Sequence, residues 1–125
     1  MNPIPQKIRL AALLGFFGVA LGAFGAHGGL ADILKAHDTV EIWKTASHYH
    51  LIHAVVLLVL GLVGGRDAPA RYGWWAMLVG VLIFSGSLYV LALTGLRWLG
   101  AITPVGGLLI MIGWLFTALR RWPRT

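Results

Sequence analysis

The sequence contains no cysteine and very little charge. Without a thiol, the chain of 125 residues can form no disulfide, no thiolate metal site and no cysteine-based nucleophile. Charged residues make up 11% of the chain, whereas a soluble domain carries about 25%. A chain with so few charges cannot cover a surface that faces water, which excludes a soluble globular fold.

Acidic residues are the scarcest of the charged ones. There are four of them, and none lies in the apolar part of a predicted span, so a membrane-embedded pair of carboxylates is excluded. Ion and proton pathways usually contain a charged residue inside a span, and here every charge is expected outside the apolar part of a span. The sequence also lacks a glycine-rich phosphate loop after a strand and a Ser/His/Asp set. We therefore predict neither an enzyme nor a transporter or channel.

Apolar residues are abundant and fall into long runs. Hydrophobic side chains make up 58% of the chain, and a membrane-spanning helix needs about 20 consecutive apolar residues. The chain is long enough for four such helices with short connections and no separate soluble module. We predict an all-α membrane protein with one domain over residues 1–125, an up-down bundle with transmembrane helices at about 8–27, 39–64, 73–94 and 103–121.

The first apolar run, Leu10 to Ala26, fits two kinds of segment. It follows two basic residues and ends in small residues, as a secretory signal peptide does. The hydrophobic region of a signal peptide is about 7–15 residues long, and this run is longer, so we favour a retained helix. The segment Leu30 to His37 has apolar residues at helical spacing and predicts a short helix in the membrane interface.

Local signals mark where the remaining helices begin. Asp38, with Glu41 three residues later, forms a capping-box-like start for the second span. The polar segment Arg66 to Arg71 contains a proline and predicts the linker to the third span. Thr103 followed by Pro104 predicts a capping hydroxyl with proline at the first helical position of the fourth span.

The basic residues predict the orientation. With four spans, one side of the membrane holds both termini and Lys7, Arg9, Arg66, Arg71, Arg120, Arg121 and Arg124, whereas the other holds Lys35, Lys44 and Arg97. Basic residues that flank short loops stay cytoplasmic, so we expect both termini in the cytoplasm of a bacterium and the chain in its inner membrane. The net charge of +6 then reflects orientation and attraction to anionic lipid, and it does not indicate a nucleic-acid partner.

Small residues recur every seven positions in each predicted span. They are Gly15, Gly22 and Gly29 in the first, Ser47, Ala54 and Gly61 in the second, Gly73, Gly80 and Ser87 in the third, and Gly106 and Gly113 in the fourth. Membrane helices associate through close backbone approach at small residues, so this repeat predicts tight packing between the spans. As an alternative, one glycine stripe forms the face of a homo-oligomer.

Five histidines gather on the predicted outer side. In the second span His50 and His53 share a face, because they lie about 60° apart at 100° per residue. Counting from His48 at the surface, His53 is about 7.5 Å deep, and Tyr89 of the third span lies at a similar depth. Together with residues from all four spans they form a candidate polar pocket: His27, Trp43, Tyr49, His50, His53, Ser85, Ser87, Tyr89 and Thr103.

Three interpretations fit this candidate pocket. The favoured one is structural, because polar groups at membrane depth are costly unless they bond across helices. The second is a metal or haem site with His27, His50 and His53 as candidate imidazole ligands. The third is a pocket for a small quinone-like molecule or for a lipid.

Four sequence motifs carry a family resemblance. They are Gly22 to Gly28 (GAFGAHG), Trp43 to Ala54 (WKTASHYHLIHA), Phe84 to Gly95 (FSGSLYVLALTG) and Leu99 to Gly107 (LGAITPVGG). In this order they resemble the domain of unknown function 423 family, small bacterial membrane proteins whose eukaryotic branch is called transmembrane protein 256. The resemblance implies a four-helix protein of the bacterial inner membrane and no established activity.

The sequence as a whole therefore favours a non-enzymatic membrane protein with an accessory or structural role. Its expected partners are the lipid bilayer and either further copies of the chain or a larger membrane complex. The alternative is a binding protein whose His/Tyr pocket holds a metal, haem, a quinone-like molecule or a lipid.

Overall fold

The computed structural model describes residues 3–123, and the regular structure within them is entirely helical. The elements are α1 (Pro3–Gly25), α2 (Gly28–Ala36), α3 (Val40–Val63), α4 (Ala68–Thr94), the short 3₁₀ helix η1 (Arg97–Ala101) and α5 (Thr103–Leu119). Four segments are long and apolar enough to cross a membrane, namely α1, α3, α4 and η1 with α5. The predicted all-α membrane fold, including the short helix between the first two spans, is confirmed.

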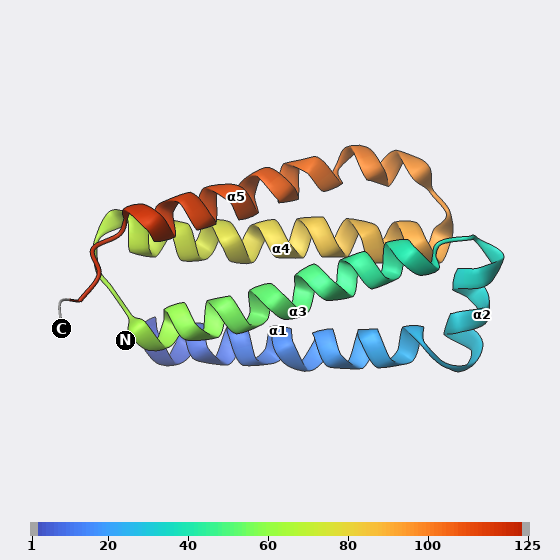
Figure 1. Ribbon diagram of the computed structural model, residues 1–125, viewed down its shortest axis with the longest axis horizontal. Coiled ribbons are helices and arrows are strands. Elements are labelled where there is room, and N and C mark those ends of the chain that lie inside the picture. Colours follow the sequence, from blue (N-terminus) through green and yellow to red (C-terminus); the bar gives the residue numbers. More distant parts are fainter. Residues whose placement is uncertain (1–2, 124–125) are drawn as a thin grey trace.

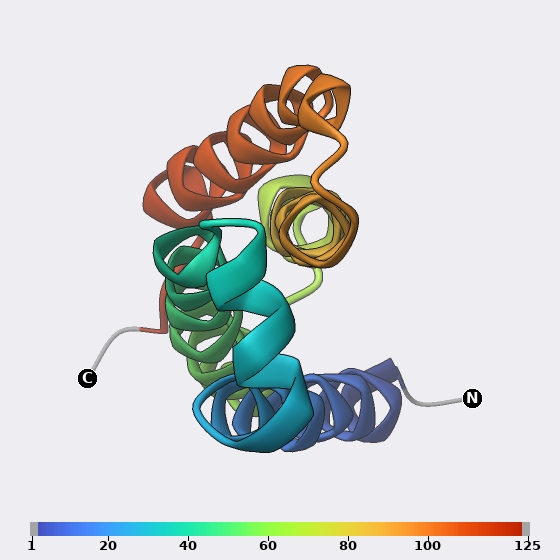
Figure 2. The ribbon, with the colours of Figure 1, turned by 90° about the vertical axis from the view of Figure 1, so that its right-hand side faces the viewer.

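The four spans run up and down and pack in the order in which they occur in the chain. Both ends of the described chain lie at one end of the bundle, and α2 runs across the other end (Figure 1). Each span packs on the next, α1 on α3, α3 on α4 and α4 on α5. Figure 2 shows α1 and α5 on opposite sides of the central α3–α4 pair. The spans therefore form an open row.

Two helices begin earlier than predicted. α1 starts at Pro3 and α4 at Ala68. The early start of α4 follows from Asp67, which takes an extended backbone at the N-cap position, and from Pro69 in the first turn, where its missing N–H costs nothing. The helices thus extend past their apolar cores. α1 therefore includes Lys7, which precedes the predicted span, and this side chain is 9% exposed and lies against Trp74 of α4.

The two predicted capping residues are also used differently. Thr39, and not Asp38, precedes α3, and its hydroxyl donates to the carbonyls of Leu34 at 3.3 Å and of Ala92 at 2.7 Å. Thr103 lies inside α5, where its hydroxyl is 2.6 Å from that of Ser87. Both hydroxyls face neighbouring elements, and there they bond across the bundle instead of capping their own helices.

Small residues bring the helix pairs together, as the seven-residue repeat predicts. Gly15 and Gly22 of α1 face Ala54 and Ser47 of α3. On the other side of the molecule α4 and α5 touch through their backbones, since a methyl group on Gly80 would lie 2.6 Å from the Ile110 nitrogen. The glycine stripes considered as homo-oligomer faces are thus largely occupied by contacts within the chain.

Candidate functional site

One group of polar side chains is buried where α1, α3 and α4 meet, around His50. The His50 Nε2 atom lies 2.7 Å from the carbonyl oxygen of Leu14, and Nδ1 lies 2.9 Å from the hydroxyl of Tyr89. A carbonyl oxygen only accepts, so Nε2 carries a proton. In the neutral ring Nδ1 then accepts from the Tyr89 hydroxyl. Both ring nitrogens are therefore engaged.

The neighbours of His50 are bonded just as completely. The Tyr89 ring packs against Trp43 with 4.6 Å between ring centroids, and its hydroxyl lies 3.3 Å from that of Ser47. The Trp43 indole donates to the Leu21 carbonyl at 2.9 Å. Ser85 donates to the Ala46 carbonyl at 2.8 Å. These bonds join three helices through satisfied polar groups, which is the structural interpretation of these residues.

His53 faces a different set of neighbours. Its Nε2 atom accepts a 3.0 Å hydrogen bond from the indole of Trp114 on α5, and its Nδ1 lies 2.8 Å from the Tyr49 carbonyl oxygen. An indole only donates and a carbonyl only accepts, so His53 is neutral with its proton on Nδ1. Trp114 thereby links α5 to α3 and bypasses α4.

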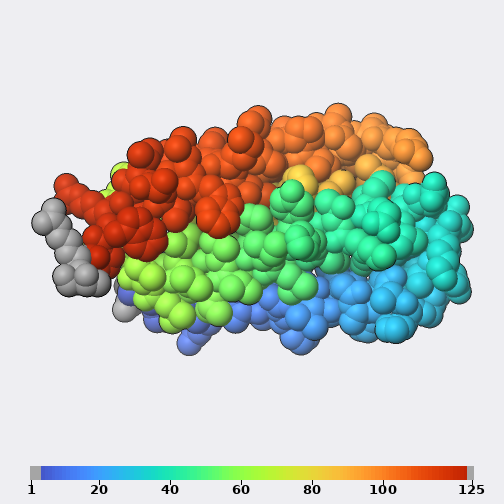
Figure 3. All heavy atoms as spheres, in the orientation of Figure 1, coloured from blue at the N-terminus to red at the C-terminus, as the bar shows by residue number. Residues whose placement is uncertain are grey.

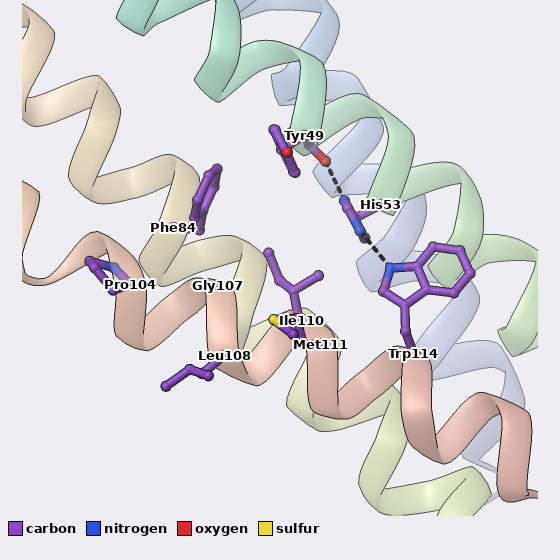
Figure 4. A pocket seen from close by; sticks show the side chains of 9 residues that line it. All are labelled: Tyr49, His53, Phe84, Pro104, Gly107, Leu108, Ile110, Met111 and Trp114. Carbon is purple, nitrogen blue, oxygen red and sulfur yellow. Dashed lines mark hydrogen bonds between the residues drawn. The ribbon is translucent and has the colours of Figure 1, made fainter.

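An apolar groove lies beside His53. Figure 4 shows side chains of α3, α4 and α5 converging on it. In Figure 3 a small patch of α4 (yellow) is visible between α3 (green) and α5 (orange). The groove has a volume of about 540 Å³ and is lined by Tyr49, His53, Phe84, Pro104, Gly107, Leu108, Ile110, Met111 and Trp114. It follows α5 from Pro104 to Trp114, a length of about 15 Å at 1.5 Å per residue.

Tyr49 supplies the unpaired polar group of this groove. Its ring stacks parallel to the His53 ring at 6.0 Å between centroids and packs on Phe84 at 4.7 Å. The side chain is 41% exposed, and its hydroxyl has no hydrogen-bond partner within residues 3–123. This hydroxyl is therefore free to bond a molecule that enters the groove.

The structure therefore divides the candidate pocket read from the sequence. Trp43, His50, Ser85 and Tyr89 belong to the buried network, and Tyr49 and His53 line the groove. Ser87 and Thr103 form a separate pair. His27 is exposed at the start of α2.

The proposed metal ligands do not come together. Between residues 3 and 123 there is no group of three histidine or acidic side chains that could hold a metal ion. His50 and His53 face different helices, because a separation of 60° on a helix is enough to direct one toward α1 and the other toward α5.

Sequence reasoning missed the residues that α5 contributes. Trp114 and Met111 line the groove, but neither was singled out from the sequence. The available signal was the indole N–H of Trp114. A donor in the apolar middle of a span must find an acceptor, and the histidines of α3 were the acceptors at hand.

The chain is similar to a set of bacterial membrane proteins. The family model described as "Protein of unknown function (DUF423)" matches residues 21–107. A UPF0382 membrane protein of Staphylococcus epidermidis is 48% identical over 109 residues, which cover 86% of this chain and 88% of the relative. A UPF0382 membrane protein of Haemophilus influenzae is 45% identical over 114 residues, 90% of each chain. No solved structure matches.

Proposed function

The chain belongs to the DUF423 family of membrane proteins, and on that premise we propose that it binds an uncharged lipid in the groove between α3, α4 and α5. The hydrocarbon chain of this lipid lies along α5, and a carbonyl oxygen near its polar end accepts a hydrogen bond from the Tyr49 hydroxyl. The observation that carries the proposal is that unpaired hydroxyl in an otherwise apolar groove.

The chemistry of the groove supports an uncharged ligand. Its walls are apolar apart from the three rings of Tyr49, His53 and Trp114, and the last two satisfy each other. No ionised side chain lines it to pair with a charged headgroup. Both nitrogens of His53 are already bonded, so a metal or haem iron would have to break a hydrogen bond to gain a ligand.

Tyr49→Phe and Gly107→Leu test this binding. A methyl group on Gly107 would meet Phe84 at an ordinary 3.7 Å, so leucine fits the helix while its side chain fills the groove. Tyr72→Phe is the matched control, because Tyr72 is exposed near the start of α4, away from the groove. We expect native mass spectrometry of the detergent-extracted protein to find a bound lipid in the wild type and in Tyr72→Phe.

The two groove variants should lose that lipid to different degrees. Removing one hydrogen bond of about 0.5–1.5 kcal/mol weakens binding roughly 2- to 12-fold in Tyr49→Phe. Filling the groove abolishes binding in Gly107→Leu. The mass of the bound species distinguishes a quinone carbonyl from a glycerolipid ester. Equal lipid occupancy in all four proteins would refute the proposal.

We also propose that the chain sits in the bacterial inner membrane with both termini in the cytoplasm. The loop between α3 and α4 and the C-terminal end of α5 lie at the end of the bundle that holds both ends of the described chain (Figure 1). The basic residues Arg66, Arg71 and Arg120 lie in or next to these segments, and basic residues favour the cytoplasmic side. A periplasm-active reporter fused after Thr125 should be inactive, and one inserted near Lys35 should be active. The reverse pattern would place the termini outside. Association with further copies or a larger complex stays a prediction, and lipid binding does not require it.

A further inference from the structure

Three basic residues meet at the end of the bundle that holds the termini, and they lack an anionic partner of matching charge. Lys7 lies on α1, Arg71 on α4 and Arg120 just after α5. Lys7 is 9% exposed and Arg120 is 6% exposed, although both residue types are almost never this buried unless paired. The salt bridge found within residues 3–123 joins Lys44 and Glu41 at the opposite end of the bundle, so it involves none of these three basic residues.

Arg120 retains a donor that nothing in the described chain accepts. One terminal nitrogen, Nη2, donates to the carbonyl of Gly64, and the guanidinium lies 4.5 Å from the centre of the Trp122 ring. The Nε atom is buried and has no hydrogen-bond partner among residues 3–123. A guanidinium carries five N–H donors that match the oxygens of a phosphate. Its unmet donor indicates an absent acceptor.

The ammonium of Lys7, which interacts with the charge of Arg120, also lacks a hydrogen-bond acceptor within residues 3–123. Its ammonium lies 5.4 Å above the Trp74 ring and makes no hydrogen bond or ion pair with the described residues. The charges of Arg120 and Arg71 both repel it. Like charges at such range destabilise one another unless an anion lies among them.

The nearest carboxylate does not fill this role. Asp67 is half-buried just before α4, and its Oδ2 accepts a 3.1 Å hydrogen bond from the backbone N–H of Arg121. Its single negative charge is outnumbered, since Arg9, Arg66 and Arg121 lie at the same end as the three basic residues above. A positive excess therefore remains.

There is space for an anion beside Arg120. A depression of about 520 Å³ lies between the loop that follows α3 and the residues that follow α5, with Arg120, Arg121 and Asp67 on its polar side. Lys7 and Arg71 do not line it and act on it through their charges. Val63 and Trp122 supply apolar walls. Gly65 lies directly against the Arg120 guanidinium, so even one added carbon would collide with it. The backbone of the loop thus leaves room for the buried arginine.

We propose that Arg120 binds the phosphate of an anionic phospholipid in this depression, and that the charges of Lys7 and Arg71 strengthen the binding. The site lies at the ends of three membrane spans, where lipid phosphates lie, and basic pockets between spans bind such headgroups. Its apolar walls accommodate the glycerol and the first carbons of the acyl chains. The proposal is independent of the uncharged lipid in the groove and of the orientation in the membrane.

The variants Lys7→Gln and Arg120→Gln test this site, with Arg97→Gln as the matched control. The control removes the same charge from an exposed position at the opposite end. Circular dichroism identifies which variants are folded. The folded proteins are titrated in detergent micelles with phosphatidylglycerol, with phosphatidylcholine and with inorganic phosphate, and lipid binding is read by native mass spectrometry.

We expect phosphatidylglycerol to bind wild type and Arg97→Gln with similar affinity. It should bind Arg120→Gln about tenfold or more weakly, because a charge-assisted bond is lost, and it should bind Lys7→Gln more weakly than wild type, because one nearby positive charge is removed. Phosphatidylcholine, which carries no net charge, should bind all of them weakly. Unchanged phosphatidylglycerol affinity in a folded site variant would overturn the proposal. Inorganic phosphate binding as tightly as the lipid would also overturn it, because the site would then be one for a free anion.

A second variant keeps the proposal testable if the glutamine substitutions prevent folding. In Lys7→Met an apolar chain of similar length replaces an unpaired buried charge, and such replacements are often neutral or stabilising. Lipid-free Lys7→Met should therefore melt at or above the wild-type temperature, and phosphatidylglycerol should raise its Tm less than that of the wild type. An equal rise in Tm in the two proteins would contradict the assignment.

Discussion

Single polar residues in this protein are placed according to whether another helix offers a partner. His50 and His53 are three positions apart on one helix, and both nitrogens of each ring are hydrogen-bonded to the protein. The two histidines have different partners: His50 bonds to α1 and α4, and His53 bonds to α5 and to its own helix. The sequence identified both residues as inward-facing. It placed them together on one face of the helix, because the rotation of α3 against its neighbours, which decides which histidine meets which helix, cannot be derived from spacing alone.

Loss of the His50 imidazole should destabilise the fold. In His50→Leu the Leu14 carbonyl and the Tyr89 hydroxyl lose their partner in a buried place, which costs about 1–3 kcal/mol. His48→Leu changes an exposed residue about 160° around α3 from His50, so it should lower the stability little. Thermal unfolding in detergent measures both. Equal stability of the two variants would mean that the network does not hold α1, α3 and α4 together.

The carboxyl of Asp67 should become protonated at a lower pH than that of an ordinary aspartate. Partial desolvation raises the pKa of its carboxyl, but hydrogen bonds from the backbone N–H groups of Arg121, Asp67 and Ala70 and the charge of Arg120 outweigh this and hold the pKa below its usual 3.8. The contact with Arg121 is therefore present above the unfolded-state pKa and is lost as pH falls through the lower folded value.

The amide resonance of Arg121 reports this contact by NMR. Its chemical shift should titrate with a midpoint below 3.8, and the titration should vanish in Asp67→Asn. A midpoint at or above 3.8 would show that the carboxylate gains nothing from the folded chain.

At the level of helices, spacing in the sequence predicts contacts better than it predicts ends. The seven-residue repeat of small residues correctly identifies the faces on which α1 meets α3 and α4 meets α5. The positions of the helix ends depend instead on the backbone conformation of the residues next to them. Asp38 adopts a φ of 56° and leaves the cap position to Thr39, which hydropathy cannot reveal.

Gly80 and Gly86 offer a matched test of the α4–α5 contact. A methyl group on Gly80 would lie 2.6 Å from the Ile110 nitrogen and 2.8 Å from the Gly106 oxygen, whereas one on Gly86 would meet nothing within 4 Å. Gly80→Ala should destabilise the protein by about 1–3 kcal/mol, because the helices must separate. Gly86→Ala should be neutral or slightly stabilising. Similar unfolding temperatures of the two would show that these backbones do not touch.

Over the whole molecule, the order of packing makes the groove. Because α1 and α5 lie on opposite sides of the α3–α4 pair (Figure 2), α5 packs mainly on α4 and reaches α3 only through side chains such as Trp114. The space left between α3 and α5 becomes the groove. Composition and hydropathy predict the four spans, but the side of the bundle on which the last helix packs follows from side-chain contacts that no single segment encodes.

A photo-crosslinking amino acid placed at Met111, in the groove, tests lipid binding most directly. The matched position is Leu115, which is comparably exposed on α5 but does not line the groove. After detergent extraction and irradiation, we predict a lipid adduct on the protein labelled at position 111, none at position 115, and loss of the adduct when Gly107→Leu is added. Adducts of equal yield at both positions, or an adduct that survives Gly107→Leu, would contradict the account.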